Sequence, residues 1–493
     1  MLHRTLPRLA KVTSYDAFLS QRSRARKPSA IRALQPLLAE PGMISLGGGM
    51  PNPSTFPFDS IRVTLSSSAT TTSSTDSNTK SGNEFELKGQ ALEDILQYSG
   101  TRGINTLLPH LFDLQSSEHG RVQPKPFEIC VTTGSQDALS KAFDLFTGAG
   151  ADEPPMLVEE PTYSGSLAYL QPTGTRLVGV KCDGQGLIPE SLDSILRNWE
   201  TDQPKNHPRP KVLYTIPTGS NPTGASLSVE RKRKIYSIAS EFNLLILEDD
   251  PYYWMQYDEE KEEEEEKTEE ESSRNTSSSS KKQQLEQKPQ QQGKRTASFM
   301  SMDVEGRVLR FDSFSKLLSS GIRVGFVTGP PALIERIEYH AQASVLHSSA
   351  VSQALVAGLF DHWKEQSGGI SSYNGFVNHC YGITEFYRLR RNNFVKSARK
   401  HLNGLVEFTV PSAGMFCWMK FLDVEDADQF IKEKARDAKV LLVPGQSFDP
   451  LNRVSPWARA AYSTASAEDM DVALERLGEL LREQKNQKNL KNK

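Results

Sequence analysis

The sequence predicts an α/β fold, with a mostly parallel β-sheet sandwiched by helices and a second, smaller α+β domain. The first observation is that short apolar runs alternate with segments of helical spacing from about residue 128 to residue 330, which is typical of βαβ units. The second is a change of texture near residue 373, where long polar helical segments begin. A chain of 493 residues is long enough for two or three domains with a large core.

The individual elements follow from these patterns. Six apolar runs are expected to form buried strands, namely EICVTT (128–133), MLVEE (156–160), VLYTIP (212–217), NLLILEDD (243–250), RVLRFDSF (307–314) and RVGFVTGP (323–330). Residues 134–146 and 228–242 have helical spacing. Beyond residue 373, GLVEFTV (404–410) and MFCWMKFL (415–422) are candidate strands. The last helix is expected to start at Ser466, with Asp469 as its capping partner and an apolar face made of Met470, Leu474, Leu477 and Leu481.

The same patterns predict a domain organisation. We expect an N-terminal arm over 1–39, a large domain over 60–372 and a small domain made of 40–59 and 373–493. Two low-complexity stretches, 66–82 and 258–297, hold too few apolar side chains to offset the entropy of ordering them. Both are expected to be surface insertions, and the second begins with the acidic run DEEKEEEEEKTEEE.

Composition and charge disfavour several classes of protein. With 58 basic and 61 acidic residues the net charge is -3, so we expect no nucleic-acid partner held by phosphate attraction. No stretch approaches the ~18 apolar residues of a membrane span. The four cysteines are far apart and form no CxxC pair, which disfavours disulfides and thiolate metal sites. We expect a cytoplasmic protein, with mitochondria as the alternative because the first fifteen residues contain Arg and Lys but no acid.

In open α/β sheets ligands bind beyond the carboxyl ends of the strands, and one such end carries a lysine. Lys316 ends the sequence SFSK (313–316), directly after the strand RVLRFD. A lysine in this position is usually a surface residue. A catalytic role requires an aldehyde cofactor that forms a Schiff base with the amine, and pyridoxal phosphate is the usual one.

That hypothesis requires a carboxylate for the pyridine nitrogen of the cofactor. The strand NLLILEDD ends in Glu248, Asp249 and Asp250. Such an acidic cluster also fits an exposed loop, but an apolar strand that leads straight into EDDPYY favours one acid directed into a cleft. We select Asp249.

The phosphate, the ring oxygen and the ring face need partners as well. Gly134, Ser135 and Gln136 open a helix after a strand, and a helix start binds anions. A simple N-cap by Thr133 or Ser135 is the alternative. The other candidates are Ser313, Ser315 and Arg323 for the phosphate, Asn221 and Tyr252 for the phenolic oxygen, and Tyr163 for stacking on the ring.

Taken together, these motifs resemble those of the fold type I pyridoxal-phosphate-dependent aminotransferases. More narrowly, the chain is similar to aromatic and 2-aminoadipate (kynurenine-type) aminotransferases, including the fungal aromatic enzymes. The matching stretches are 44–58, 96–103, VTTGSQDAL (131–139), EEPTYSGSL (159–167), YTIPTGSNPTG (214–224), 246–254, FDSFSKLLSSGIRVGF (311–326), 412–420 and ARAAYS (458–463). They cover nearly the whole chain outside the two insertions and the tail. The acidic insertion, which lies between Asp249 and Lys316, is a departure from the family pattern.

The resemblance implies a seven-stranded type of sheet and a role for each matching residue. Lys316 would be the Schiff-base lysine, Asp249 the pyridine partner, and Arg459 the ligand of the substrate α-carboxylate. The other roles would be substrate binding by Gly49, Tyr98 and Asn221, with Tyr98 reaching into a neighbouring subunit of a homodimer. Residues 23–32 would form a mobile arm over the substrate.

The implied reaction is ping-pong transamination through the Schiff base of Lys316. It would move the amino group of phenylalanine, tyrosine, tryptophan or kynurenine to 2-oxoglutarate. A 2-aminoadipate aminotransferase of lysine biosynthesis and a β-lyase are alternatives on the same fold. A transcription regulator is disfavoured because only about forty residues precede ISLGGGMPN, and a non-catalytic relative is disfavoured because each chemical position is filled.

Overall fold

The computed structural model describes residues 11–30, 32, 40–44, 46, 49–66, 83–120, 127–148, 153–204, 207–257 and 295–491. Its central feature is an eight-stranded sheet in the order β3-β10-β9-β8-β7-β4-β5-β6. The strands are β3 Glu128–Thr132, β4 Met156–Glu160, β5 Leu177–Asp183, β6 Gly186–Leu187, β7 Val212–Thr215, β8 Leu245–Asp249, β9 Val308–Ser313 and β10 Gly325–Gly329. Each of the six predicted strands is confirmed, while β5 and β6 are additional.

The sheet is mostly parallel, as predicted. Strands β5, β4, β7, β8 and β9 pair in parallel, whereas β10 runs antiparallel to both β9 and β3. Because β10 reverses direction between them, β3 and β9 run the same way. The carboxyl ends of β3, β4, β7, β8 and β9 therefore lie along one edge of the sheet.

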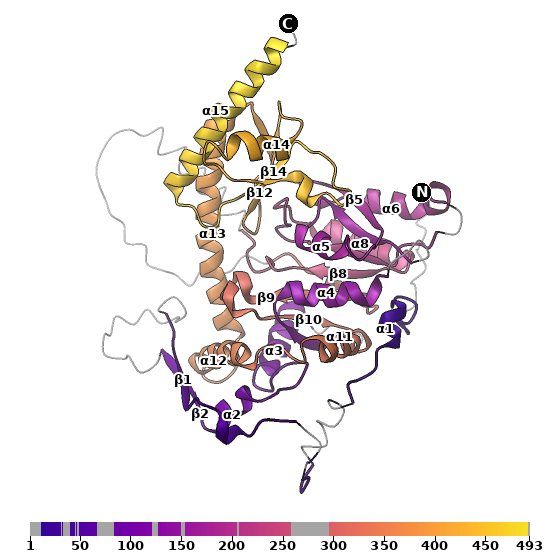
Figure 1. Ribbon diagram of the computed structural model, residues 1–493, viewed down its shortest axis with the longest axis vertical. Helices are drawn as coiled ribbons and strands as arrows, with labels where there is room; N and C mark the ends of the chain where they lie inside the picture. The colour runs from indigo at the N-terminus through magenta and orange to yellow at the C-terminus, as the bar shows by residue number, and fades with distance from the viewer. Residues whose placement is uncertain are drawn as a thin grey trace, which may run out of the picture.

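Helices cover both faces of this sheet (Figure 1). Alternate residues of β8 face opposite layers: Leu245 and Leu247 pack with α4 and α11, whereas Ile246 packs with α6, α8 and α10. The helices of this domain are α3 Leu108–His119, α4 Ser135–Phe146, α5 Ser164–Leu170, α6 Pro189–Arg197, α7 Trp199–Asp202, α8 Val229–Glu241, α10 Phe299–Met302, α11 Pro331–Ser344 and α12 Ala350–Gln366, with the short 3-10 helices η5 Phe314–Lys316 and η6 Ser320–Ile322.

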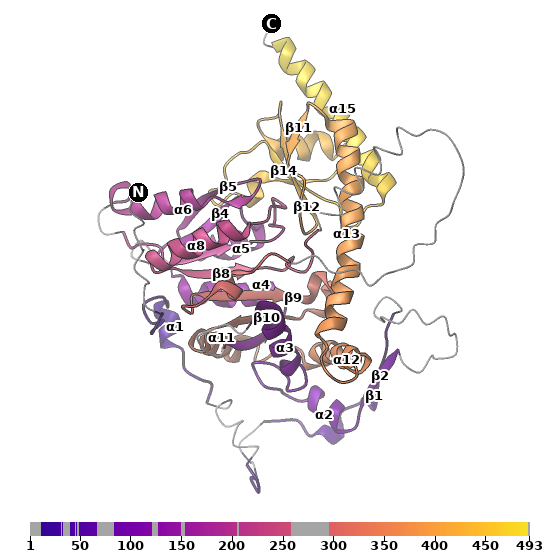
Figure 2. The same ribbon diagram turned by 180° about the vertical axis from the view of Figure 1, so that it is seen from behind.

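The helix α13, Tyr373–Leu402, connects this layer structure to a smaller antiparallel sheet (Figures 1 and 2). The order of that sheet is β11-β12-β14-β13. Its elements are β11 Val406–Phe408, β12 Phe416–Phe421, α14 Ala427–Phe430, the π-helical turn η7 Ile431–Ala435, β13 Val443–Pro444, η8 Gly445–Phe448, β14 Trp457–Ala461 and α15 Ala467–Lys491. The predicted cap of the last helix is confirmed, because the Asp469 amide donates to Ser466 Oγ at 3.0 Å. The four apolar residues predicted for one face of α15 are buried.

The first N-terminal helix, α1 Gln21–Ala25, packs beside α4. The elements β1 Ser60–Thr64, β2 Glu84–Lys88 and α2 Gln90–Leu96, which follow the 3-10 helix η2 Pro53–Thr55, lie at the opposite end of the molecule from the small sheet (Figure 1). The Gln97 amide donates to Pro51 O at 2.8 Å, so the segment at residue 51 lies beside α2 in this chain. The assignment of 40–59 to the small domain, and the other domain boundaries, stay predictions.

The two predicted insertions lie mostly outside the described residues, which omit 67–82 and 258–294. The last residues of the second prediction are described, and they are part of the packed structure. Arg295 pairs with Glu118, with an N–O distance of 2.6 Å, and lies over the ring of Trp254. Within the described residues, none of the helices combines the length and apolar character that a membrane crossing requires.

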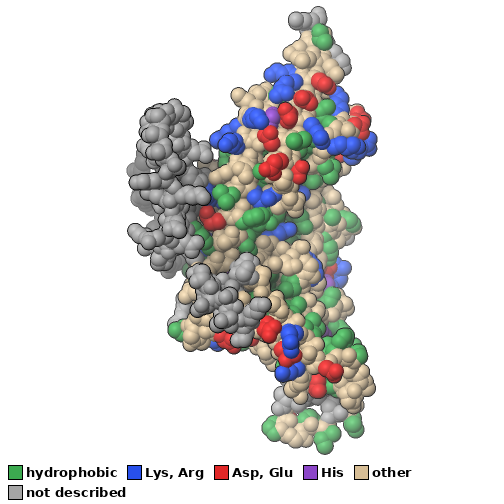
Figure 3. Space-filling model, turned by 90° about the vertical axis from the view of Figure 1, so that its left-hand side faces the viewer, with side chains coloured by type: hydrophobic (Ala, Val, Ile, Leu, Met, Phe, Trp, Pro, Cys, Tyr) green, Lys and Arg blue, Asp and Glu red, His purple; other side chains and the backbone are tan. Residues whose placement is uncertain are grey.

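Charged side chains of both signs are interspersed on the face shown in Figure 3, over the end that carries α15. Hydrophobic side chains lie at the opposite end of the same face. This distribution agrees with the nearly balanced charge of the sequence.

Candidate active site

Six of the predicted residues come together beyond the carboxyl ends of the strands. We call this group the open cluster; it consists of Tyr163, Asn221, Asp249, Tyr252, Lys316 and Arg459. Their proximity is evident from mutual electrostatic effects and from one direct hydrogen bond. Residues from β14 of the small sheet and from four loops of the large sheet thus meet in one place, as the sequence predicted.

Lys316 is the last residue of η5, directly after β9. The turn is held by the Ser315 amide, which donates to Ser313 Oγ at 3.2 Å. Burial lowers the pKa of the Lys316 amine, and the nearby Arg323 and Arg459 guanidinium groups lower it further. A larger share of neutral amine makes this lysine a better nucleophile and base than one in water.

The structure separates the three acids at the end of β8. Tyr214 donates its hydroxyl to Asp249 Oδ2 at 2.8 Å, and Asp249 Oδ1 is buried without a hydrogen-bond partner. Burial raises the pKa of Asp249 to about 7; the Tyr214 hydrogen bond opposes this rise, and the neighbouring Asp250 carboxylate adds to it. Asp249 therefore has a buried oxygen available for a cationic or N–H group of a ligand.

Glu248 and Asp250 are engaged elsewhere. They lie on the other face of the strand, where Arg310 pairs with Asp250 at 3.0 Å, with Asp312 at 3.0 Å and with Glu248 at 3.4 Å. We call these four residues the closed cluster. The backbone amides of Phe299 and Met300 also donate to Glu248. The selection of Asp249 from the sequence is consistent with this arrangement.

The Arg323 guanidinium lies against the start of α4, the predicted phosphate site. Gly134 precedes the helix with a φ of +80°, and a Cβ atom at this position would lie 2.3 Å from Arg323 Nη2. The Arg323 guanidinium donates to Thr133 O at 3.2 Å and to Ser315 Oγ at 3.1 Å, so it spans the gap between β3 and η5. Glycine is required here because any side chain would displace the guanidinium group.

The alternative of a simple N-cap for α4 is wrong. The N-cap residue is Gly134, which makes no side-chain hydrogen bond to the helix, and the Thr133 amide donates to Asp137 Oδ2 instead. The start of α4 therefore lacks a side-chain cap, which suits a bound anion. Of the two predicted contacts in its first turn, Ser135 is half-buried, and Gln136 donates to Gly165 O at 3.0 Å.

Arg459 lies on β14 with its guanidinium between two aromatic rings, 4.2 Å from the centroid of Phe416 and 5.0 Å from that of Phe448. Its Nη1 donates to Asn221 Oδ1 at 2.8 Å, and its Nε is buried without a partner. The cation therefore retains a donor for a further anion. Because Arg459 occupies Oδ1 of Asn221, the amide nitrogen of that side chain is the group left to act as a donor toward a ligand.

The two tyrosines supply aromatic surface to the open cluster. Tyr163 is half-buried at the start of α5, and burial raises its pKa, with Asp249 contributing to the rise. Tyr252 is buried and packs edge-on against Phe416, with ring centroids 5.8 Å apart. Burial and the Asp249 carboxylate also raise the pKa of Tyr252, so its hydroxyl stays protonated and can donate.

Two predicted residues lie apart from the open cluster in this chain. Tyr98 is exposed and contacts the ring of His347 and the guanidinium of Arg32. Gly49 is exposed, and a Cβ atom there would have open space. Neither observation tests the proposed contact with a neighbouring subunit.

The sequence did not identify three residues that belong to the site region. Tyr214 and Glu159 are buried polar residues within strands, at 0% and 2% exposure, and Phe448 packs against Arg459. A polar side chain inside an otherwise apolar strand is the signal that could have indicated the first two. Phe448 is the last residue of the short 3-10 helix η8 and has no comparable signal.

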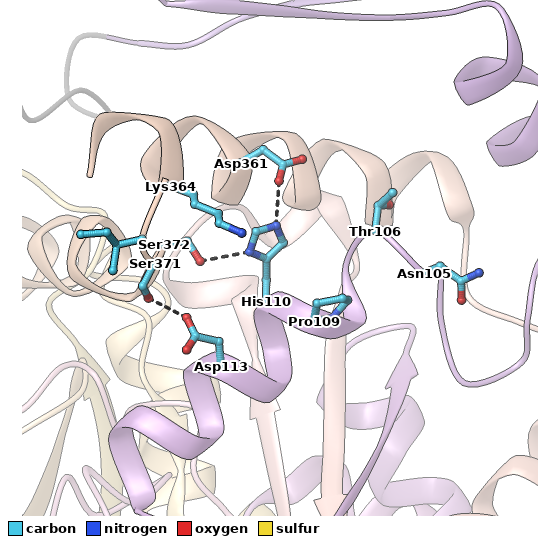
Figure 4. Close-up of a pocket in the computed structure, with 10 residues that line it drawn as sticks. Asn105, Thr106, Pro109, His110, Asp113, Asp361, Lys364, Ser371 and Ser372 are labelled. Carbon is cyan, nitrogen blue, oxygen red and sulfur yellow. Dashed lines mark hydrogen bonds and ion pairs between the residues drawn. The ribbon is translucent and has the colours of Figure 1, made fainter. Parts of the chain in front are cut away.

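A separate pocket of about 320 Å³ lies between α3, α12 and the start of α13 (Figure 4). His110 bonds Ser372 Oγ through Nδ1 at 3.1 Å and Asp361 Oδ1 through Nε2 at 2.9 Å. A hydrogen-bonded series of Ser, His and Asp can activate a serine nucleophile. Here, however, Ser372 is only 1% exposed. Its hydroxyl is therefore inaccessible to a substrate, and the contacts serve to connect the three helices.

Comparisons with known proteins agree with this geometry. The sequence profile of the family described as aminotransferase class I and II matches residues 62–477. The chain is 38% identical to the mitochondrial kynurenine/alpha-aminoadipate aminotransferase of Bos taurus, over 95% of this chain and 99% of the relative.

Solved structures are similar as well. The aromatic aminotransferase Aro9 from Candida albicans has a TM-score of 0.76 and 26% identity, and the match covers 96% of this chain and 98% of the other. The kynurenine aminotransferase of Pyrococcus horikoshii, in complex with PMP and with kynurenine as substrate, has a TM-score of 0.67 and 25% identity, with 96% and 98% covered.

Proposed function

Because the chain belongs to the aminotransferase class I and II family, we propose that it transfers the amino group of an aromatic amino acid to 2-oxoglutarate. The donors proposed are phenylalanine, tyrosine, tryptophan and kynurenine. The observation that carries the proposal is that a half-buried Lys316 of lowered pKa and Asp249, whose buried Oδ1 lacks a hydrogen-bond partner, both belong to the open cluster.

The residues present fit pyridoxal phosphate. When bound, this cofactor supplies an aldehyde for amines and a ring that accepts electrons from the broken Cα–H bond. Lys316 would hold the aldehyde carbon, and Asp249 Oδ1 would accept the hydrogen bond of the pyridine N–H. The phosphate would lie at the start of α4, with Ser135, Gln136, Ser313, Ser315 and Arg323 around it, while Asn221 and Tyr252 would donate to the phenolic oxygen and Tyr163 would stack on the ring.

Different side chains of the open cluster would then bind the substrate and transfer its proton. Arg459 would bind the α-carboxylate through its planar fork. The Lys316 amine would take the proton from the substrate Cα, which its lowered pKa favours. The rings of Phe416, Phe448 and Tyr163 around Arg459 and Asp249 would exclude water from the site.

A second candidate donor is 2-aminoadipate. It is favoured by the 38% identity to an enzyme named for both kynurenine and alpha-aminoadipate. Selectivity between long acidic and aromatic side chains rests on contacts worth about 1–3 kcal/mol. A β-lyase remains a third activity to be tested, because the same residues would activate the substrate Cα–H bond.

A substrate panel tests the function. Purified protein with added pyridoxal phosphate is given each aromatic donor, kynurenine or 2-aminoadipate, with 2-oxoglutarate as the acceptor, and glutamate formation is measured. We expect the aromatic donors to give the highest kcat/KM. Release of pyruvate and ammonia from a β-substituted substrate, without glutamate, would indicate a β-lyase, and no reaction with any donor would contradict the proposal.

We further propose a homodimer whose interface includes the end of the molecule where α2 lies. Exposed apolar side chains gather in this part of the described chain: Met43, Ile44, Met50, Phe58, Tyr98, Val345 and Leu346. Exposed apolar area of this kind often marks an interface. Light scattering after gel filtration is expected to give about twice the chain mass of 54.9 kDa, and a mass equal to one chain would contradict the proposal.

For the compartment we propose the cytoplasm. The four cysteines are free thiols, which fits a reducing compartment. The bovine relative is named mitochondrial, so fractionation of cells that express the full chain has to distinguish the two locations.

A further inference from the structure

A buried carboxylate lies behind the open cluster and has no role in the mechanism above. Glu159 is the second-last residue of β4 and is 2% exposed. Its Oε1 accepts from Thr215 Oγ1 at 2.5 Å and from the Ile216 amide at 3.1 Å, and its Oε2 accepts from Ser220 Oγ at 3.2 Å. The three donors belong to the end of β7 and to the loop that follows it.

Hydrogen bonding, rather than charge pairing, accounts for these contacts. Within the described residues no lysine, arginine or histidine forms an ion pair with Glu159. Burial raises the pKa of Glu159 to about 7, and its three hydrogen bonds oppose that rise. Burial of a carboxylate without a cation costs free energy unless hydrogen-bond donors compensate it, and here three donors do so.

The loop held by Glu159 is a closed turn. The Ser220 amide donates to Ala225 O at 2.8 Å, and the Gly224 amide donates to Ser220 O at 2.6 Å. At Gly219 a Cβ atom would lie 2.8 Å from the backbone of Ala413, so the turn abuts the small-domain segment closely. The turn is therefore closed by its own hydrogen bonds, and the Ser220 hydroxyl joins it to Glu159 at the end of β4.

The turn presents Asn221 to the open cluster. Asn221 directly follows Ser220, and its Oδ1 accepts from Arg459 Nη1 at 2.8 Å. We propose that Glu159 is a positioning residue, which holds Asn221 and, through it, the guanidinium of Arg459 in the orientation that receives the carboxylate of the substrate. This inference rests on the proposed function, since it assigns substrate binding to Arg459.

Two substitutions of Glu159 distinguish the effect of its hydrogen bonds, which would position the turn, from the effect of its negative charge. In Glu159→Gln the amide oxygen can still accept from Thr215 and Ile216, and the amide nitrogen can donate to Ser220 Oγ. In Glu159→Ala all three contacts are lost. The matched control is Glu160→Ala, because the neighbouring carboxylate pairs with Arg453 at 2.5 Å rather than with the turn.

The experiment measures steady-state kinetics and, independently of turnover, the binding of glutarate to the holoenzyme by calorimetry. Glutarate has the carboxylates of 2-oxoglutarate but cannot react. We expect Glu159→Ala to raise both KM values and the glutarate Kd roughly tenfold, with kcat changed by less than about threefold. Glu159→Gln and Glu160→Ala are expected to stay within about threefold of wild type.

Several outcomes would overturn the positioning role. A folded Glu159→Ala protein with unchanged KM and glutarate Kd would do so, and so would a Glu159→Gln protein as impaired as Glu159→Ala. Should Glu159→Ala fail to fold, Ser220→Ala decides: it removes one contact, and an unchanged glutarate Kd in that variant would reject the inference. Failure of the proposed function is a different result, in which wild type itself transaminates no donor.

Discussion

The open cluster lies beyond the carboxyl ends of the strands, whereas the closed cluster lies on the face of β8 opposite to Asp249, and the two differ in how their charges are compensated. In the closed cluster each of the three carboxylates has an Arg310 nitrogen within 3.4 Å. In the open cluster Asp249 Oδ1 and Arg459 Nε are buried without partners. Asp250 Oδ1 in the closed cluster also lacks a hydrogen-bond partner, but the Arg310 cation pairs with its carboxylate. Within the described residues neither Asp249 nor Arg459 forms an ion pair, so their charges are what a ligand would complete. The buried charged groups of the open cluster that lack a counter-ion are therefore the candidates for contacts with a ligand.

The two clusters meet at consecutive residues. Asp249 and Asp250 project to opposite faces because side chains alternate along a strand. Asp249 meets the Tyr214 hydroxyl, while Asp250 meets Arg310. Substitutions of the two acids should therefore have opposite effects on stability.

The largest effect is expected at the nucleophile of the open cluster. Lys316→Ala should reduce kcat by roughly 10³-fold or more, because a positioned acid–base group contributes about 10²–10⁴-fold. Glutamate formation from an aromatic donor provides the measurement. Lys364→Ala, an exposed lysine of α12, is the control and should retain its rate. Wild-type turnover in Lys316→Ala would show that the lysine assignment is wrong.

Removal of the cation from the closed cluster should be the next largest change. Arg310→Met removes the cation that pairs with Glu248, Asp250 and Asp312, so we expect a loss of about 3–5 kcal/mol in the free energy of unfolding. The loss should be smaller at pH 5 than at pH 8, since protonation neutralises the acids. Urea unfolding at both pH values tests this. The exposed control Arg436→Met should stay within about 0.5 kcal/mol of wild type, and a loss that does not depend on pH would exclude the electrostatic explanation.

Asp249→Asn should lower the rate by about 10²-fold and raise the stability of the cofactor-free protein. The folded pKa of Asp249, about 7, is above the ordinary value of 3.8. This group therefore costs no stability below pH 4, an increasing amount from pH 4 to 7, and a constant amount above pH 7. We expect the free energy of unfolding of Asp249→Asn to equal that of wild type at pH 4 and to exceed it by on the order of 2–4 kcal/mol at pH 8.

The neighbouring substitution Asp250→Asn is the comparison for that prediction. It removes a partner of Arg310 and should destabilise the protein at pH 8. Thermal unfolding of both variants at pH 4 and pH 8 measures the contrast. If both variants were stabilised at pH 8, or both destabilised, the distinction between the clusters would be contradicted.

The smallest expected effect is that of Tyr214→Phe. This change removes one hydroxyl from Asp249 and leaves the ring in place, so a loss of about 1 kcal/mol is expected, or roughly three- to tenfold in kcat/KM. Without that donor the pKa of Asp249 should rise further, and the acidic limb of the pH–rate profile should move to higher pH. An unchanged profile would mean that Tyr214 does not orient the carboxylate.

Much of the large domain could be predicted because its strands are apolar on both faces. The runs at 156–160 and 245–249 are buried throughout or nearly so, and such runs stand out in any sequence. Strand β5 was missed because its burial pattern is weaker and it lies near the sheet edge. Strand β14 was missed as a strand because Arg459 interrupts a short run of alanine.

For the site, the sequence determined which chemical groups are present: an amine, three candidate acids, a glycine before a helix and an arginine in the small domain. Only the tertiary structure decided between Asp249 and Asp250, brought Tyr214 and Phe448 to their partners, and placed Glu159 behind the turn of Asn221. The physical reason is that residue types and strand ends are local properties of the chain. Pairing across β7, β8 and β9, by contrast, depends on register and on which face each side chain takes, and only the folded sheet sets these.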